Sequence, residues 1–184
     1  MDYEHLPDAE LVVEAKTGSQ LAFRELTNRY WPRLERYVTR LAPDITESED
    51  LVQEAFVKIY LNLQGYTTKT RFSTWAYRIT HNTLIDHVRS LKHRAALFFD
   101  PEELFPHPHS PQQPDTEAEK ESVRHTLDQH LTDLPTKYRI PLVLYYFEDM
   151  DYQDISDVLR IPRGTVGIRL SRGLKLLREK FSHA

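Results

Sequence analysis

The feature that most constrains the fold of this chain is a proline-rich, acidic stretch at residues 98–115. Its sequence, FFDPEELFPHPHSPQQPD, holds five prolines and no basic residue. Proline lacks the amide hydrogen that a helix interior needs, and it restricts the residue before it, so this stretch can form neither a helix nor a packed core. It is also longer than most connections inside a compact domain. It therefore predicts a flexible linker between two domains, residues 1–97 and 116–184.

The sequence on both sides of this linker has the periodicity of helices. Apolar residues recur at spacings of mostly three and four, and the alternation typical of strands is nowhere sustained. One such stripe comprises Leu51, Ala55, Phe56, Ile59, Tyr60 and Leu63. Residues that commonly cap helices precede the periodic segments: Ser19, Thr46, Ser73, Thr116 and Asp151. We therefore predict an all-α chain of two small helical domains.

Several classes of function are excluded by what the sequence lacks. There is no cysteine, which rules out disulfides, thiolate zinc sites and a cysteine nucleophile. There is no glycine-rich phosphate loop, and Asp86 with His81 and His87 is the nearest approach to a catalytic cluster. His107 and His109 in the linker are weak candidates for metal binding. We predict no enzymatic activity, no catalytic residue, no cofactor and no metal site.

Nothing in the sequence indicates insertion into a membrane. No apolar run approaches the ~20 residues of a membrane span. The first ten residues, MDYEHLPDAE, are acidic where a signal peptide would be basic. We predict a soluble, cytoplasmic protein.

The net charge of −4 conceals two basic segments. Residues 61–99 carry six basic side chains and one acidic side chain, and residues 160–184 carry seven and one. A local concentration of positive charge can follow a phosphate backbone although the whole chain is acidic. Both segments are therefore candidates for nucleic-acid binding, with solvated helix faces as the alternative.

The C-terminal basic segment has the pattern of a helix-turn-helix. Residues 151–178 read as a short capped helix, a turn of about four residues, and a second amphipathic helix. Ile155, Val158 and Leu159 form the inner face of the first helix, and Val166, Leu170, Leu174 and Leu177 that of the second. The second helix would fit the major groove, where arginine can pair with guanine. The alternative is an exposed basic helix at the end of an ordinary bundle.

The first basic segment differs because aromatic residues alternate with its cations. Residues 66–94 place Tyr66, Phe72, Trp75 and Tyr77 among lysines and arginines. Rings beside cations suit unpaired bases, which stack on aromatic side chains. The alternative is that the rings belong to the core, and Phe72 and Trp75 fit that reading well. Upstream, a mostly acidic helix face comprises Asp50, Gln53 and Glu54, with Lys58 as a further candidate for the same side. Residue types alone favour a solvated surface there over a protein interface.

Four segments together resemble an extracytoplasmic-function (ECF, group 4) sigma factor of the sigma-70 family. They are EDLVQEAFVKIY (49–60), RFSTWAYRITHNTLIDHVR (71–89), LTDLPTKYRIPLVLYY (131–146) and DISDVLRIPRGTVGIRLSRGLKLLR (154–178). The likeness spans nearly the whole chain except the first ~15 residues and the linker. It implies a region 2-like domain that binds the clamp of core RNA polymerase and the melted −10 element, and a region 4-like domain that binds the duplex −35 element.

The resemblance also assigns roles to particular positions. It implies polymerase contacts at Asp50, Leu51, Val52, Gln53 and Glu54. It implies contacts with the −10 strand around the Tyr66–Phe72 loop and α-helical Asn82, at Thr68, Lys69, Arg71, Phe72, Trp75, Arg78, Asn82 and Arg89. It implies −35 contacts at Arg163, Thr165, Ile168, Arg169, Ser171 and Arg172. Gly167 and Gly173 depart from the family pattern, which usually has a basic residue and an alanine there.

The family further implies regulation by an anti-sigma factor, often anchored in the membrane. Such a partner would hold the protein at the membrane, and release would let it join the nucleoid. Two other functions fit the residues without a polymerase. One is a helix-turn-helix repressor or activator that dimerises through its N-terminal bundle, and the other is a helical adaptor that binds acidic partners and no DNA.

Overall fold

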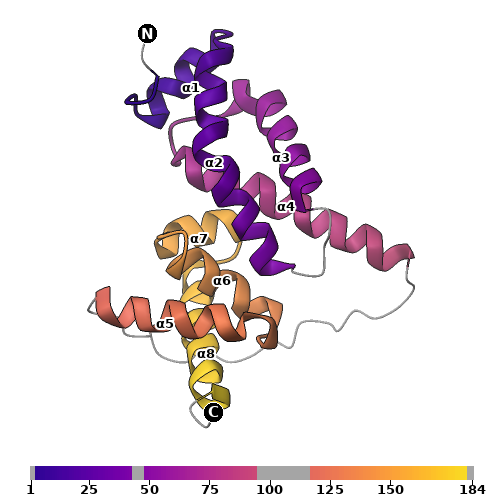
Figure 1. The fold of residues 1–184 in the computed structure, drawn as a ribbon, viewed down its shortest axis with the longest axis vertical. Helices are drawn as coiled ribbons and strands as arrows, with labels where there is room; N and C mark the ends of the chain where they lie inside the picture. The colour runs from indigo at the N-terminus through magenta and orange to yellow at the C-terminus, as the bar shows by residue number, and fades with distance from the viewer. Residues whose placement is uncertain (1–2, 43–47, 95–116, 182–184) are drawn as a thin grey trace. The chain divides into compact units, whose positions relative to one another are not determined.

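The computed structural model describes residues 3–42, 48–94 and 117–181 (Figure 1). The chain divides into two compact units, Met1–Lys92 and His93–Ala184. Every regular element in the described residues is a helix, which confirms the predicted all-α fold. The predicted linker, with His107 and His109, lies outside the described residues, so its boundaries stay a prediction. None of the helices within the described ranges is long and apolar enough to cross a membrane.

The first unit contains four α-helices and a short 3₁₀-helix in its described part. They are α1 (Asp8–Lys16), α2 (Gln20–Leu41), α3 (Ser48–Asn62), η1 (Leu63–Gly65) and α4 (Phe72–Arg94). Gly18, at φ 100°, reverses the chain between α1 and α2, and the Ser19 hydroxyl accepts the amide of Ala22 as the predicted N-cap. Ser73 was predicted to cap the next helix, but α4 already begins at Phe72. The predicted cap Thr46 lies outside the described residues.

The core of the first unit forms around α2, which packs against both α1 and α3 (Figure 1). Leu26, Leu34 and Val38 of α2 are fully buried. Helix α4 meets α2 through large side chains, since the rings of Tyr37 and Tyr77 lie 5.2 Å apart edge to face. Burial of these apolar and aromatic groups is the main source of stability for such a small unit.

The second unit contains α5 (Glu117–His130), η2 (Leu131–Asp133), α6 (Thr136–Tyr146), α7 (Tyr152–Leu159) and α8 (Arg163–Phe181). Helices α6 and α7 both pack on α8. Arg124 of α5 donates to the carbonyl of Tyr146 and pairs with Asp149 at 2.8 Å, which fixes α5 against the C-terminal end of α6. The predicted cap Thr116 lies outside the described residues.

Helices α6 and α8 approach closely at Gly173. A Cβ atom placed there would lie 2.7 Å from Leu142 Cδ1 and 3.2 Å from Tyr138 Cβ. Leu142 is fully buried, so its side chain has little room to move. The glycine that departs from the family pattern therefore permits the close packing of these two helices.

Replacing Gly173 with alanine is expected to destabilise the second unit by up to about 2 kcal/mol. The overpacking cost of about 1–3 kcal/mol outweighs the helix-propensity gain of about 1 kcal/mol. Gly164→Ala is the matched control, because no atom lies within 4 Å of a Cβ there, and it is expected to stabilise the helix. Hydrogen exchange of the α6 and α8 amides measures both effects. Equal stabilisation by the two alanines would contradict the close approach.

Candidate functional site

Residues 151–178 form the predicted helix-turn-helix, with α7 as its first helix and α8, which continues to Phe181, as its second. The Asp151 carboxylate accepts the amide of Asp154 at 2.8 Å, which confirms it as the N-cap of α7. Arg160 ends α7 in the left-handed conformation at φ 53°, and the Ser156 hydroxyl donates to the carbonyl of Ile161 at 2.6 Å. These local contacts fix the turn between α7 and α8. The predicted inner face is largely confirmed, with five positions buried and Leu159 and Leu174 half-buried: Ile155, Val158, Val166, Leu170 and Leu177.

The side chains proposed to read the −35 element lie away from that inner face. Arg163, at the start of α8, is exposed. The remaining five candidates are half-buried: Thr165, Ile168, Arg169, Ser171 and Arg172. Lys175 extends this basic surface by one further turn and pairs with Glu179 at 3.6 Å. One side of α8 therefore combines arginines with small hydroxyl and aliphatic groups, a set suited to base edges and phosphates.

In the first unit, the Tyr66–Phe72 loop exposes polar side chains and buries its aromatic ones. Thr68, Lys69 and Arg71 are exposed. Phe72 and Trp75 are only 3% and 8% exposed, and their ring centroids lie 5.8 Å apart. Both rings are therefore core residues, as the sequence favours for these two positions, and the structure does not support direct contact of either ring with a base.

Helix α4 carries the other −10 candidates on one side. Asn82 and Arg89 are exposed and Arg78 is half-buried. Their spacings of four and seven residues place all three on the same face of the helix. Arg89 lies 3.9 Å from Asp86. The face offers an amide that can pair with a base edge, and cations for phosphates.

The ring of His81 is half-buried against Tyr37 of α2. Its Nδ1 lies 3.0 Å from the Tyr37 hydroxyl. Burial lowers the pKa of His81 to about 4, so the ring is neutral at physiological pH. Over the described part of the chain, no group of three or more acidic or histidine side chains is arranged to hold a metal ion.

The acidic face of α3 is exposed as the sequence predicts. Of the five residues that the resemblance assigns to polymerase contact, however, two lie in the core. Asp50, Gln53 and Glu54 are exposed. Leu51 and Val52 are 3% and 0% exposed, so they pack in the core and direct contact with a partner by these two is not supported. Their spacing explains this, because positions 51 and 52 begin the same buried stripe as Ala55, Phe56 and Ile59.

An apolar surface next to these acidic residues was missed by the sequence analysis. Val57, Tyr60 and Leu61 of α3 are exposed, Leu61 by 71%. Tyr60 had been predicted to face the core, but its ring instead meets Phe23 of α2 on the surface, at a centroid distance of 4.9 Å. The sequence does contain an indication of this surface, because α3 has more apolar residues than one face of a helix can bury. We call Asp50, Gln53, Glu54, Val57, Tyr60 and Leu61 the α3 face.

The fold and these surfaces define a class of protein, a helical DNA-binding transcription factor. The family models of Sigma-70 region 2 and Sigma-70 region 4 match residues 26–94 and 124–177. The ECF RNA polymerase sigma factor SigW of Bacillus subtilis is 30% identical over 178 residues, which cover 92% of this chain and 94% of SigW. The RNA polymerase sigma-H factor of Pseudomonas aeruginosa is 30% identical over 171 residues, with 90% and 89% coverage.

This chain belongs to the ECF sigma factors, which direct transcription initiation and are not enzymes. Solved structures show the same fold. CnrH in complex with the cytosolic domain of CnrY matches with a TM-score of 0.69 and 21% identity, over 99% of both chains. The sigma factor RpoE in complex with the anti-sigma factor NepR from Bartonella quintana matches with a TM-score of 0.65 and 19% identity, over 85% of this chain and 94% of RpoE.

Proposed function

We propose that this sigma factor binds core RNA polymerase through the α3 face and selects promoters by joint contacts of its two units with the −10 and −35 elements. The observation that carries this proposal is that each unit has a separate surface of exposed and half-buried side chains that is rich in cations. One is on α8, and the other spans the 68–71 loop and α4. Binding both to one polymerase raises their effective concentration at two promoter sites. In this proposal the first domain covers residues 1–97 and the second covers residues 116–184.

The α3 face is proposed to dock on the clamp of the largest polymerase subunit. Its two carboxylates would complement a basic surface on the clamp, and the adjoining Val57, Tyr60 and Leu61 would supply apolar contact area. Aromatic residues at the centre of such a patch commonly dominate the binding energy. Leu51 and Val52 contribute by holding α3 in the core.

At the −10 element, the proposed contacts are with an opened strand. The exposed Thr68, Lys69 and Arg71 and the α4 face formed by Arg78, Asn82 and Arg89 would bind its bases and phosphates. The energy of binding the displaced strand offsets the cost of unstacking its bases. The buried Phe72 and Trp75 support the loop from behind.

At the −35 element, α8 is proposed to lie in the major groove of duplex DNA. Arg163, Arg169 and Arg172 would pair with guanine edges or phosphates, and Ile168 would contact a thymine methyl group. Thr165 and Ser171 would add hydrogen bonds to bases or the backbone.

We also propose an anti-sigma factor as a partner and the cytoplasm as the location, with recruitment to the nucleoid when the protein is active. The RpoE structure contains the anti-sigma factor NepR, and the exposed apolar residues of the α3 face are a surface that such an inhibitor could cover. If the inhibitor is membrane-anchored, the inactive protein would be held at the membrane.

Run-off transcription with purified core polymerase and fragmented genomic DNA tests the function. We expect defined transcript starts that require this chain. Tight binding of the free protein to a palindromic duplex, without any effect of core polymerase, would instead favour a polymerase-independent regulator. The absence of specific transcripts and of DNA binding would favour an adaptor.

Two substitutions in that assay separate the two recognition events. Arg172→Ala is expected to weaken −35 recognition by about 1–3 kcal/mol and to relax specificity at one base pair, whereas Lys175→Ala should weaken binding uniformly across sequences.

Asn82→Ala is expected to impair use of the −10 element and to leave duplex binding by the second unit unchanged. Equal loss of both activities in Asn82→Ala would argue against this division.

A further inference from the structure

Helix α1 lies outside the matched region 2, which begins at residue 26, yet its last residue is bonded to the start of the Tyr66–Phe72 loop. Lys16 Nζ donates to the carbonyl oxygen of Tyr66 at 2.6 Å and to that of Gln64 at 3.3 Å. In return, Gln64 Nε2 donates to the carbonyl of Lys16 at 2.8 Å. The ammonium group also lies 5.8 Å from the centre of the Tyr66 ring. The ammonium group of Lys16 thus binds the main chain at the start of the loop.

The first residue of α1 reaches the other end of the same loop through Tyr30. The Tyr30 hydroxyl donates to Asp8 Oδ2 and is also hydrogen-bonded to the side chain of Ser73. The Tyr30 ring meets the Phe72 ring edge to face at a centroid distance of 5.1 Å. Asp8 therefore supports the junction where the loop passes into α4.

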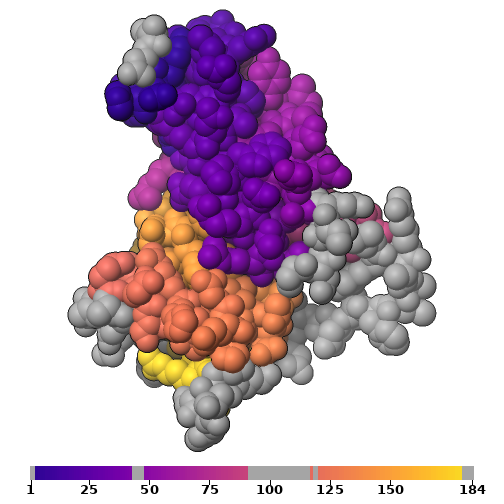
Figure 2. All heavy atoms as spheres, in the orientation of Figure 1, coloured from indigo at the N-terminus to yellow at the C-terminus, as the bar shows by residue number. Residues whose placement is uncertain are grey.

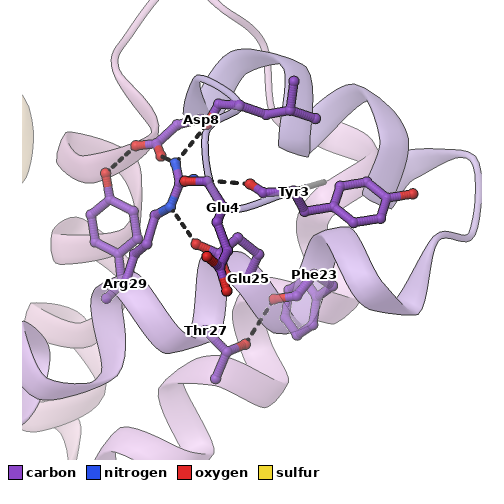
Figure 3. A network of polar contacts seen from close by, with 9 residues as sticks. Tyr3, Glu4, Asp8, Phe23, Glu25, Thr27 and Arg29 are labelled. Carbon is purple, nitrogen blue, oxygen red and sulfur yellow. Dashed lines mark hydrogen bonds and ion pairs between the residues drawn. The ribbon is translucent and has the colours of Figure 1, made fainter. Parts of the chain in front are cut away.

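Arg29 holds Asp8 in position. Its guanidinium lies among oxygens from the N-terminal segment and α2, as Figure 3 shows. Arg29 Nη1 bonds Asp8 Oδ1 at 3.0 Å, and Nε bonds Glu25 at 2.8 Å. The remaining donors bind the main-chain carbonyls of Tyr3, Glu4 and Leu6. In the space-filling view, the indigo N-terminal residues adjoin the purple atoms of the first unit (Figure 2).

The loop is also closed upon itself. The Tyr66 hydroxyl donates to the carbonyl of Thr70 at 2.7 Å, and the Tyr66 ring packs on Phe72 and Trp75 at centroid distances of 5.9 and 5.1 Å. The bonds of Lys16 at one end of the loop, and the contact of Asp8 with the other end through Tyr30, complete this framework. A loop fixed in this way loses less conformational entropy when it captures a ligand.

We infer that α1 anchors the −10 loop, with Lys16 and Asp8 as positioning residues that set how well the loop captures an opened promoter strand. This inference rests on the proposed function of the loop. Neither residue needs to touch DNA, because each acts on the loop through Tyr66 or Tyr30. The effect is specific to the −10 element, since the α3 face and the second unit have no part in these bonds.

The experiment uses holoenzyme assembled from the full chain and core polymerase. The probe is a forked promoter DNA with a duplex upstream part and a single-stranded −10 segment of randomised sequence. Sequencing the bound fraction gives the enrichment at each −10 position. Affinity for core polymerase and tryptophan-detected thermal unfolding are measured in parallel. The variants are Lys16→Met, its conservative rescue Lys16→Arg, and Asp8→Asn.

Lys16→Met is expected to lower −10 enrichment about tenfold, the scale of one lost charge-assisted hydrogen bond, with core affinity unchanged. Lys16→Arg should keep enrichment within about twofold of the parent. Asp8→Asn is expected to lower it by a smaller factor, because its amide oxygen can still accept from Tyr30. Arg36→Met, which removes an exposed cation from α2, is the charge control and should change nothing.

Unchanged enrichment in Lys16→Met would overturn the inference. So would a joint loss of enrichment, core affinity and thermal stability, because it would mean that Lys16 only keeps the unit folded. If Lys16→Met does not fold, Gln64→Ala replaces it as the test variant, because it removes only the hydrogen bond from Gln64 to the carbonyl of Lys16. Unchanged −10 enrichment in Gln64→Ala would also count against the anchor. Failure of the parent holoenzyme to enrich any −10 sequence would refute the proposed function itself.

Discussion

Replacing Phe72 with alanine is expected to lower the free energy of unfolding of the first unit by about 3–5 kcal/mol. The ring is 3% exposed and contacts the rings of Tyr30, Tyr66 and Trp75. Its removal would leave a cavity beneath the −10 loop. Urea unfolding followed by tryptophan fluorescence measures this directly, because both tryptophans, Trp31 and Trp75, lie in the first unit.

Phe72→Leu distinguishes a core role from base stacking. Leucine keeps most of the buried apolar volume, so the cost in stability should stay below about 1.5 kcal/mol. Recognition of the −10 element should then survive in Phe72→Leu and fail in Phe72→Ala. If Phe72→Leu is stable and nevertheless loses −10 recognition, the ring must contact a base, and its assignment to the core is wrong.

Acidification is expected to destabilise the first unit through His81. Burial lowers the pKa of His81 from 6.5 to about 4. Between pH 6.5 and about 4, His81 is therefore protonated in the unfolded chain and neutral in the folded chain. The contribution of His81 to the free energy of unfolding is constant above pH 6.5, falls as the pH drops, and is lower by about 3 kcal/mol near pH 4.

The measurement is urea unfolding at a series of pH values for the parent and for His81→Gln. Glutamine can accept the hydroxyl of Tyr37 but does not titrate. Because the carboxylates are the same in both proteins, the difference between the two curves isolates His81. We expect this difference to change between pH 6.5 and 4 and to be flat above pH 6.5. A difference that is flat over the whole range would show that the folded protein accepts the proton.

In α3, sequence periodicity predicts the exposure of some residues correctly and of others wrongly. The acidic positions Asp50, Gln53 and Glu54 were placed correctly on the surface. Tyr60 is exposed although it belongs to the predicted stripe, whereas Leu51 is buried as the stripe predicts. The polymerase contacts at Leu51 and Val52 are implied by the family resemblance and not by periodicity, and both residues are buried. A helix with apolar residues on more than one side has no single buried face in its sequence. The neighbouring helices decide which apolar residues are covered.

The second unit could be read more completely from its sequence. The Asp151 cap, the turn before Pro162 and the buried positions of α8 follow from contacts between residues within a few positions of each other. The role of Gly173 could not be read in this way. The sequence shows a glycine in a helix, and only the crossing with Leu142 of α6 gives it a purpose.

The sequence by itself determined the helical elements and the helix-turn-helix, because caps and helical periodicity depend on residues close together in the chain. It indicated the family through the resemblance of four segments. The tertiary structure alone decided that Lys16 of α1 is bonded to the start of the −10 loop. Lys16 and Tyr66 are 50 residues apart. A contact over that distance depends on how α1, α2 and α3 pack, and local propensity carries no information about it.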